Sequence, residues 1–373
     1  MKHLFVTNDF PPKLGGIESY LTNLCSGFDP KDITVVAPSR SGSEKVDREL
    51  PYKVIRLPGT YLRATRGTYA GLVDAVQTRK PKAVHFLAAL PLGRLGSRLA
   101  AQTGVGWSVV AHGTGEILLP ARVPLARRAL RKVLMAADVV LPVSEFTRAE
   151  VDRITRNKAR TCLLHPSVDT DRFSLDVSGF EVRERHGLGR SFVVTFVSRL
   201  VKRKGADVLI RAVAGMQGTV ALIVGTGPEA ASLQRLARES EAADRILFAG
   251  MVPDEQLPSY YAAADVFCMP CTNRYGGLDT EGFGVVYLEA QATGLPCVAG
   301  KCGGSAEAVV DDVTGIVIED PTPKSLGEVL VELRKDPARC AMLGGAGRSR
   351  MEQEFAPAVI AARLDSAMKE ALG

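Results

Sequence analysis

Two carboxylates eight positions apart stand out in the C-terminal half of the chain. Glu281 and Glu289 lie in residues 279–296, where a glycine-rich loop runs into an apolar segment that stops at Gly294-Leu-Pro296. We expect residues 283–292 to form a helix, so that Glu281 precedes it and Glu289 lies two turns along it. At about 1.5 Å per residue the pair would span roughly 12 Å, the length of a sugar nucleotide from its sugar to its ribose. Two solvated glutamates could have the same spacing. Other residues must therefore decide between a sugar-nucleotide site and an ordinary surface loop before a helix.

Cationic side chains follow the first apolar run of the same half. Arg199 and Lys204 come directly after residues 192–197, which read as a strand. A guanidinium and a nearby ammonium suit a pyrophosphate leaving group, because they neutralise its charge as it develops. Lys202 and Arg203 stand beside them, so a solvated basic loop is the alternative interpretation.

Glycines follow other apolar runs. Gly15-Gly16 separates a first strand from a helix expected at residues 17–24, and small residues there let a backbone approach a diphosphate. The spacing is not Gly-x-Gly-x-x-Gly and no acidic residue ends the second strand, so a dinucleotide fingerprint is absent. Gly225 and the pair Gly250-Met251 also follow strand-like runs. These loops can face a nucleotide, or they can simply be turns.

His112 ends the predicted strand 108–111, at the edge where open α/β sheets bind ligands. Its imidazole or its backbone carbonyl can assist chemistry there, although a structural histidine would occupy the same place.

Two patterns could suggest metal binding. Asp169-Thr-Asp171 is similar to the Asp-x-Asp motif of some sugar-nucleotide enzymes, but it sits in the expected interdomain connection. Cys268 belongs to an apolar run, so Cys268-Met-Pro-Cys271 is expected to pack in a core, since zinc would need four convergent ligands. We therefore expect no metal site.

Composition indicates an ordinary soluble enzyme-sized chain. It has 373 residues, 46% of them hydrophobic, which predicts two domains. The seven scattered cysteines, the lack of a long apolar run and the lack of a signal-peptide core predict an intracellular, cytoplasmic protein with reduced thiols. Aromatic residues make up only 6%, too few for a base-stacking platform, so we expect no nucleic-acid partner.

Charge is distributed unevenly. Residues 1–165 carry 25 Lys and Arg against 13 Asp and Glu, whereas residues 166–373 carry 22 against 28. The basic first half suggests an anionic partner or a solvated basic face. The segment 122–135 adds a basic, partly amphipathic helix that suits an anionic membrane surface, although an ordinary half-buried helix with a solvated face would have the same composition. Its cations are Arg122, Arg127, Arg128, Arg131 and Lys132.

The order of the elements predicts an α/β fold. Apolar runs alternate with helical stretches and then the pattern restarts, which is typical of two successive doubly wound units with parallel sheets. We place one domain at 1–166 and the other at 167–356, followed by an amphipathic helix at 357–373. The expected strands are 4–7, 33–37, 54–57, 83–86, 108–111 and 139–143, then 192–197, 220–224, 246–248, 266–269, 297–299 and 316–318.

Taken together, these motifs resemble the family 4 retaining glycosyltransferases of GT-B fold, over nearly the whole chain. Within that family, the start Val6-Thr-Asn-Asp-Phe-Pro-Pro and the block 277–290 resemble the actinobacterial GDP-mannose-dependent phosphatidylinositol monomannoside mannosyltransferases. The resemblance rests on Gly15-Gly16, Ser198-Arg199-Leu, Lys204-Gly205, Gly225-x-Gly227, Glu281-x7-Glu289, Gly294-Leu-Pro296 and Gly303-Gly304.

The resemblance implies a fold and a reaction. Two Rossmann-like domains would face each other across a cleft, the first binding the acceptor and the second the nucleotide sugar, with residues 357–373 packing back on the first. The enzyme would be a retaining, metal-independent hexosyltransferase that needs no cofactor. It would use GDP-mannose and a glycolipid acceptor, and it would be cytoplasmic or peripheral on the inner face of the membrane.

The resemblance also implies a role for each matching residue. Arg199, Lys204 and Gly16 would clamp the diphosphate, and Glu289 would bind the ribose. Glu281 would bind the hydroxyls of the donor sugar. The remaining contacts would come from the backbone of Gly282, Phe283 and Gly284, from His112 near the reacting carbon, and from Gly250-Met251 near the base.

The sequence departs from the family pattern at two places, the first of them on the acceptor side. The residues after His112 read Gly-Thr-Gly-Glu, where the mannosyltransferases resembled carry a second histidine and then a tryptophan, and the connection reads Pro166-Ser167-Val. Two alternatives therefore stay open: transfer from UDP-glucose or UDP-GlcNAc to a soluble aminocyclitol or polysaccharide, and a catalytically dead nucleotide-binding or membrane-scaffold protein.

Overall fold

Every apolar run expected to be a strand forms one in the computed structural model, which describes residues 1–13 and 15–373. The chain divides into two units. The N-terminal unit comprises Met1–Ser167 and Pro357–Gly373, and the C-terminal unit comprises Val168–Ala356. Ser167, assigned above to the second domain, groups with the first, where its buried carbonyl accepts a hydrogen bond from Asn23.

The N-terminal unit contains a parallel sheet with strand order β3-β2-β1-β4-β5-β6. Its strands are β1 (His3–Val6), β2 (Ile33–Pro38), β3 (Lys53–Leu57), β4 (Ala83–Phe86), β5 (Gly106–Ala111) and β6 (Val139–Pro142). Its helices are α1 (Gly16–Ser26), α2 (Ser43–Glu49), α3 (Arg66–Arg79), α4 (Gly96–Thr103), α5 (Leu119–Arg122), α6 (Pro124–Ala136), α7 (Glu145–Thr155) and α16 (Pro357–Leu372).

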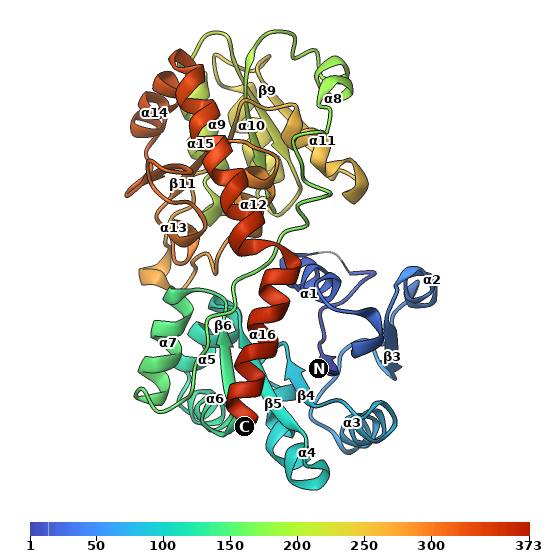
Figure 1. Ribbon diagram of the computed structural model, residues 1–373. Helices are drawn as coiled ribbons and strands as arrows, with labels where there is room; N and C mark the ends of the chain where they lie inside the picture. The colour runs from blue at the N-terminus through green and yellow to red at the C-terminus, as the bar shows by residue number, and fades with distance from the viewer. Residues whose placement is uncertain (14) are drawn as a thin grey trace. The chain divides into compact units, whose positions relative to one another are not determined.

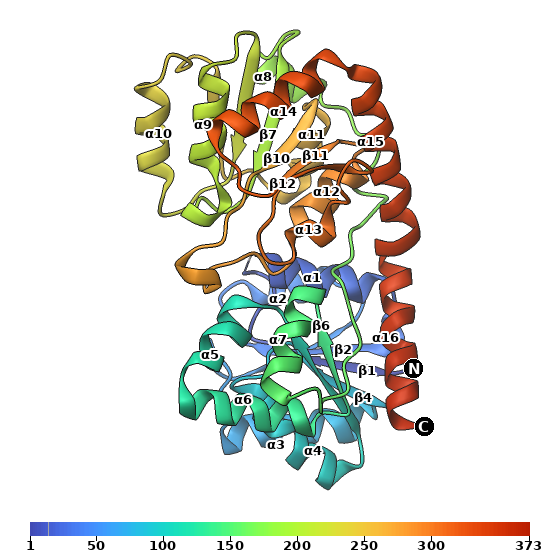
Figure 2. The same cartoon turned by 90° about the vertical axis from the view of Figure 1, so that its left-hand side faces the viewer.

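Strand alternation splits the apolar core of this unit into two clusters. Leu4 and Val6 of β1 pack into one cluster and Phe5 into the other, because successive strand residues point to opposite faces. The helix α16 joins the second cluster through residues four positions apart, Ile360 and Leu364. Figures 1 and 2 both show α16, in red, lying alongside this sheet although it is the last element of the chain.

The C-terminal unit repeats the same strand order, as β12-β11-β10-β7-β8-β9. Its strands are β7 (Phe192–Val197), β8 (Thr219–Val224), β9 (Ile246–Gly250), β10 (Val266–Met269), β11 (Cys297–Gly300) and β12 (Gly315–Ile318). Its helices are α8 (Phe180–Arg185), α9 (Ala206–Ala214), α10 (Ala230–Arg238), α11 (Leu257–Ala262), α12 (Val285–Ala292), α13 (Ser305–Ala308), α14 (Pro323–Lys335) and α15 (Pro337–Arg350).

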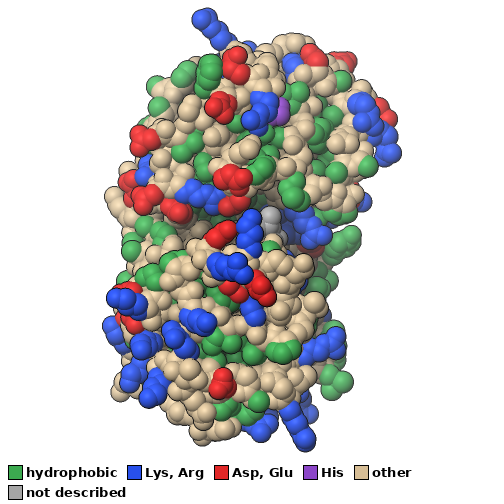
Figure 3. All heavy atoms as spheres, turned by 90° about the vertical axis from the view of Figure 1, so that its right-hand side faces the viewer, with side chains coloured by type: hydrophobic (Ala, Val, Ile, Leu, Met, Phe, Trp, Pro, Cys, Tyr) green, Lys and Arg blue, Asp and Glu red, His purple; other side chains and the backbone are tan. Residues whose placement is uncertain are grey.

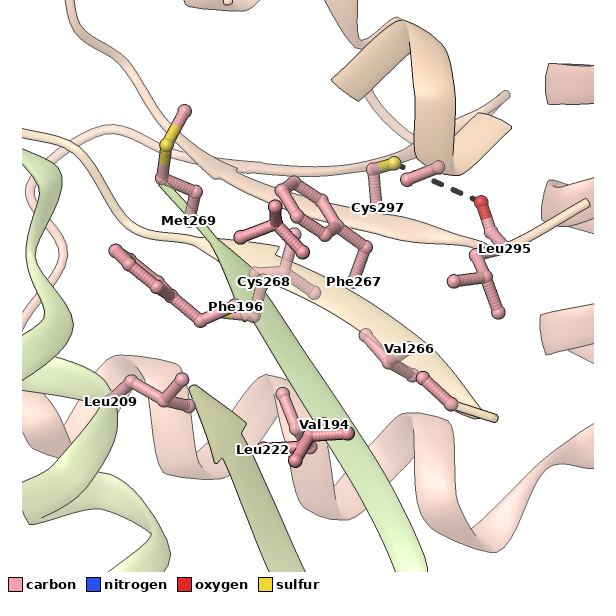
Figure 4. Packing of buried hydrophobic residues seen from close by; sticks show 14 of the residues in the cluster. Val194, Phe196, Leu209, Leu222, Val266, Phe267, Cys268, Met269, Leu295 and Cys297 are labelled. Atoms are coloured by element: carbon pink, nitrogen blue, oxygen red, sulfur yellow. Dashed lines mark hydrogen bonds between the residues drawn. The ribbon is translucent and has the colours of Figure 1, made fainter. Parts of the chain in front are cut away.

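The core of the C-terminal unit surrounds β7 and β10. Val194, Phe196 and Phe267 are fully buried, and Figure 4 shows their side chains packed among those of neighbouring strands and helices. Cys268 is buried in the same cluster, as the apolar run around it predicts. In both units the first and fourth strands are neighbours, and the crevice at their carboxyl ends is where doubly wound sheets bind ligands.

Two predicted helices have different bounds. The helix carrying Glu289 begins at Val285 rather than at residue 283, because Gly284 adopts a left-handed backbone (φ 95°) that a helix cannot contain. The basic helix expected at 122–135 is α6, which begins two residues later, at Pro124, because α5 ends at Arg122. Proline lacks the N–H that a continuing helix needs and is favoured in a first helical turn.

The surface reflects the uneven charge. On the face that Figure 3 shows, Lys and Arg side chains outnumber acidic ones over the N-terminal unit, in the lower part of the view. Among the described residues, no helix is long and apolar enough to cross a membrane.

Candidate active site

A buried ion pair lies at the carboxyl ends of β7 and β10. Lys204 ends a short 3-10 turn after β7, and Glu281 lies in the loop between β10 and α12. Lys204 Nζ is 2.6 Å from Glu281 Oε2, and Arg203 Nε is 3.7 Å from the same oxygen. Only 10% of the Lys204 side chain and 12% of the Glu281 side chain are exposed, so water screens this pair weakly. The structure therefore brings together two residues that were predicted to act on the donor.

These cations set the ionisation of Glu281. Burial acts most strongly on this carboxyl and would raise its pKa, but the charges of Lys204 and Arg203 outweigh burial and lower the pKa below its usual value. Arg203 also bonds Asp279 Oδ1, at 3.2 Å. Arg203, considered above as a solvated side chain, thus belongs to the site.

The main chain of Glu281 is held as firmly as its side chain. Its N–H donates to Cys302 Sγ at 3.3 Å, and its carbonyl accepts from Gly304 N–H at 3.0 Å. A side chain at Gly303 would overlap that carbonyl, which explains the glycine there. The adjacent Phe283 is buried, and Gly282 and Gly284 complete the loop before α12.

Glu289 occupies a separate position on α12. Its side chain is buried, and Tyr261 donates a hydrogen bond to Oε2 at 2.7 Å. Burial raises the pKa of Glu289 above its usual value, although the bond from Tyr261 partly offsets this effect. Oε1 has no protein partner among the described residues, so it is available to accept a hydroxyl.

Arg199 and the glycine loops lie at the ends of β7, β8 and β9. Arg199 is exposed and has no ion-pair partner among the described residues. Gly225 (φ 122°) donates to the carbonyl of Gly250 at 2.7 Å, and a side chain on Gly225 would overlap the carbonyl of Ser198. Close approach of two backbones accounts for glycine at Gly225. Met251 beside it is 71% exposed.

The N-terminal unit contains the remaining predicted residues. Gly15 precedes α1, and Gly16 is the first residue of that helix. The Glu18 carboxylate lies close to Gly15, since a Cβ added there would meet Glu18 Oε2 at 2.6 Å. Lys13 pairs with Glu18 Oε1 at 3.1 Å. A carboxylate and an ammonium therefore already lie at this helix N-terminus.

His112 follows β5 and is neutral near pH 7. Burial lowers the pKa of His112 to about 4, against smaller opposing effects of Asp9 and of a hydrogen bond to the Leu87 backbone. The ring of Tyr20 meets it edge-on, with centroids 5.0 Å apart. Nε2 is buried and unpartnered within the described part of the chain.

Sequence reasoning missed three residues that contact this machinery. Tyr261 lies 28 positions from Glu289, and no local pattern links them. Arg203 stands between Lys202 and Lys204, and nothing in the sequence distinguishes it from a solvated basic residue. Glu116 follows His112 by four positions, and its raised pKa comes from burial that only the fold creates.

The two patterns that could suggest metal binding make contacts within the protein. Asp169 Oδ1 accepts hydrogen bonds from the N–H groups of Asp171 and Arg172, which closes a turn. Cys271 Sγ donates to the Gly300 carbonyl at 3.4 Å. Among residues 1–13 and 15–373, no group of His, Cys, Asp and Glu is arranged to hold a metal ion.

Comparison with known proteins identifies the family. The family model described as Glycosyltransferase Family 4 matches residues 14–172, and that described as Glycosyl transferases group 1 matches residues 180–350. A GDP-mannose-dependent alpha-(1-6)-phosphatidylinositol monomannoside mannosyltransferase of Mycolicibacterium smegmatis is 40% identical over 92% of both chains. The chain belongs to the family 4 glycosyltransferases.

A relative from another genus and a solved structure support this assignment. The GDP-mannose-dependent monoacylated alpha-(1-6)-phosphatidylinositol monomannoside mannosyltransferase of Corynebacterium glutamicum is 36% identical to this glycosyltransferase, over 99% of this chain and 98% of its own. The structure of Anabaena HepE in complex with UDP has a TM-score of 0.84 at 20% identity, covering 99% of this chain and 100% of that one. The glycosyltransferase thus has the GT-B fold, as the sequence predicted.

Proposed function

We propose that this glycosyltransferase transfers mannose from GDP-mannose to a hydroxyl of a phosphatidylinositol mannoside, with retention of configuration. Relatives that are 36–40% identical over nearly the full chain carry out GDP-mannose-dependent transfer of this kind, by their names. The observation that carries the proposal to this chain is the buried pair of Lys204 and Glu281 at the strand ends of the C-terminal unit.

The donor would extend from Glu281 to Glu289. Arg199 would bind the diphosphate through its guanidinium, which pairs with no carboxylate among the residues that the structure describes. Lys204 would join it, because a diphosphate competes with Glu281 for its ammonium. Glu281, released in part from Lys204, would then accept hydroxyls of the sugar, and Oε1 of Glu289 would accept a ribose hydroxyl. The loops at Gly250 and Met251 would lie near the base.

The reaction would proceed on one face of the sugar. Arg203, 3.7 Å from Glu281 Oε2, lowers the nucleophilicity of this carboxylate even when Lys204 turns to the diphosphate, which argues against a covalent glycosyl intermediate. The departing diphosphate would accept the proton of the attacking hydroxyl, while Arg199 and Lys204 stabilise its charge. By analogy with the loss of an oxyanion donor, each cation would contribute on the order of 10²–10³ in rate. His112 would contact the sugar near the reacting carbon through its backbone carbonyl.

We also propose that the reaction needs no metal, since Arg199 and Lys204 supply the positive charge that Mg²⁺ provides in other transferases. Activity should survive EDTA within about twofold. A loss that Mg²⁺ restores would contradict this part of the proposal.

A lipid acceptor requires access to a membrane, and the α5–α6 segment suits that role. Leu125 is 83% exposed and Val123 55% exposed at the start of α6, although both are apolar. The opposite face of α6 is buried through Leu130 and Leu134. The cationic residues of the same segment are Arg122, Arg127, Arg128, Arg131 and Lys132. A hollow of about 410 Å³ lies on α6, lined by Arg128, Arg131, Lys132, Met135 and Ala136. Apolar insertion combined with cationic attraction is how peripheral helices bind anionic lipids.

Vesicle sedimentation tests this surface. Leu125→Ser and, separately, reversal of charge at Arg127 and Arg128 should each weaken binding to phosphatidylglycerol vesicles several-fold in low salt. Met342→Ser, which changes an equally apolar residue that is 61% exposed on the C-terminal unit, should leave binding unchanged. Equal binding by all variants would remove α6 as the membrane surface.

A donor-by-acceptor screen tests the function itself. GDP-mannose, UDP-glucose and UDP-GlcNAc would each be supplied with phosphatidylinositol mannosides, with soluble cyclitols, or alone. Transfer from GDP-mannose to the lipid supports the proposal, and preference for a UDP-sugar with a soluble acceptor would replace it. If the donor binds but is neither transferred nor slowly hydrolysed, the site is catalytically dead.

A further inference from the structure

Glu116 is a buried carboxyl group that the donor chemistry does not use. It lies in the wide helical turn Thr114–Leu118, between β5 and α5. The backbone N–H of His112 donates a hydrogen bond to this carboxyl group. Its Oε2 is buried and has no partner among the described residues. The carboxyl group is therefore held in place with one oxygen free.

A second free polar atom belongs to the residue that follows β5, just before this turn. Nε2 of His112 is also buried and unpartnered, and the ring bonds the backbone of Leu87. Since Nε2 has no partner, that bond comes from Nδ1, and Nε2 is left as an acceptor. Leu87 follows β4 and His112 follows β5, so both residues lie at the carboxyl edge of the sheet. This part of the edge adjoins the switch point between β1 and β4.

Such a pair requires an explanation. A buried polar group without a hydrogen bond costs about 1–3 kcal/mol, and native proteins contain few of them. Two such groups four residues apart, in a region where this fold binds ligands, indicate groups whose partners come from a ligand.

The local charges define the chemistry of that ligand. Burial, which acts most strongly, and the nearby Asp9 raise the pKa of Glu116 to about 8, so the carboxyl group is mostly protonated near pH 7. A protonated carboxyl donates one hydrogen bond and the imidazole Nε2 accepts one. Neither the protonated carboxyl group nor the neutral imidazole carries a positive charge that would attract an anionic ligand group, and Asp9, three residues after β1, is itself paired with Lys13. A hydroxyl-bearing, uncharged ring fits this combination, whereas a phosphate does not.

We propose that Glu116, with His112 Nε2, forms a subsite for the uncharged polyol ring of the acceptor, and that the acceptor's phosphate binds elsewhere. The inference rests on the proposed function, which it deepens by assigning an acceptor-binding residue. Glu116 orients hydroxyls of the acceptor and takes no proton from the reaction.

Kinetics of Glu116→Ala and Glu116→Gln test the proposal, with Glu49→Ala, an exposed residue of α2, as the matched control. Glu116→Ala should raise the acceptor KM at least tenfold, while the donor KM and the slow hydrolysis of donor without acceptor stay within twofold. Glu116→Gln keeps a neutral donor and should retain most of the acceptor affinity at pH 7. Above pH 8 the wild-type affinity should fall as Glu116 ionises, whereas that of Glu116→Gln should not.

A donor-free measurement separates this proposal from the proposed function. Saturation-transfer NMR with methyl α-mannoside and with myo-inositol should detect binding to the wild type and its loss in Glu116→Ala. If the wild type fails to transfer from GDP-mannose, the proposed function fails and the NMR result still tests the subsite. Binding equal in wild type and Glu116→Ala, or donor hydrolysis that falls together with transfer, would overturn the subsite.

Discussion

Replacing Lys204 by methionine should destabilise the C-terminal unit as well as abolish transfer. The substitution leaves Glu281 buried, with 12% of its side chain exposed and Arg203 at 3.7 Å as its remaining cation. Removing one partner of a buried ion pair costs about 3–5 kcal/mol. Because Arg203 remains, we expect the lower end, about 3 kcal/mol. For a unit of this size that loss lowers Tm by roughly 6–12 °C.

A double-mutant cycle shows whether the cost comes from the unpaired carboxylate. Glu281→Gln removes that charge, so Lys204→Met combined with Glu281→Gln should recover at least half of the stability lost by Lys204→Met alone. All three variants should lose transfer, because each lacks the ammonium of Lys204, the carboxylate of Glu281 that would bind the sugar hydroxyls, or both. Thermal unfolding followed by far-UV circular dichroism would measure the stabilities. Fluorescence of Trp107, the single tryptophan, follows the N-terminal unit.

The pH dependence provides a second check. In the wild type the pKa of Glu281 is lowered, so its contribution to stability is present above the unfolded-state pKa and is lost as pH falls through the folded-state value. Without Lys204 burial dominates, and the carboxylate costs more as pH rises. The difference between wild type and Lys204→Met should therefore be larger at pH 7 than at pH 4.5. A difference that does not change with pH, or a cycle with no coupling, would refute the reasoning.

Three further predictions concern other buried groups. Tyr261→Phe removes the hydrogen bond to Glu289 and should weaken GDP binding about tenfold by calorimetry, since bonds to charged groups contribute about 1.5–3 kcal/mol; an unchanged Kd would exclude the ribose role. Burial lowers the pKa of His3 to about 4, so the free energy of unfolding should have its full value above pH 6.5. It should fall by on the order of 3 kcal/mol as pH drops toward 4. His3→Gln should flatten this part of the pH profile, measured by unfolding in urea. Gly225→Ala should lower Tm far more than Gly250→Ala, because a side chain meets a backbone carbonyl only at the first position; similar Tm losses would contradict the close approach.

Local patterns were sufficient to predict the strands and the family. Buried parallel strands are apolar along their whole length, so runs such as those in β7 and β8 could be recognised without any tertiary contact. The residues after such strands must lie at one edge of the sheet, which is why Arg199 and Lys204 could be placed there from their positions. The resemblance to the family 4 glycosyltransferases joined them with Glu281 into one expected donor site.

Helix boundaries were harder to predict, because they depend on single backbone conformations. The sequence favoured a helix from residue 283, but the left-handed φ of Gly284 delays it to Val285. Likewise, Pro124 divides the basic segment and leaves Leu125 exposed among arginines, a combination that a helical projection of 122–135 does not reveal.

The sequence by itself determined which strands form and at which edge of each sheet the candidate residues lie, since both follow from strand periodicity. Only the tertiary structure decided which charges meet. It paired Glu281 with Lys204 and Arg203, placed Tyr261 against Glu289, and left Glu116 with a free, buried oxygen. The physical reason is that desolvation and Coulomb interactions depend on distances between segments far apart in the chain, and local spacing does not encode those distances.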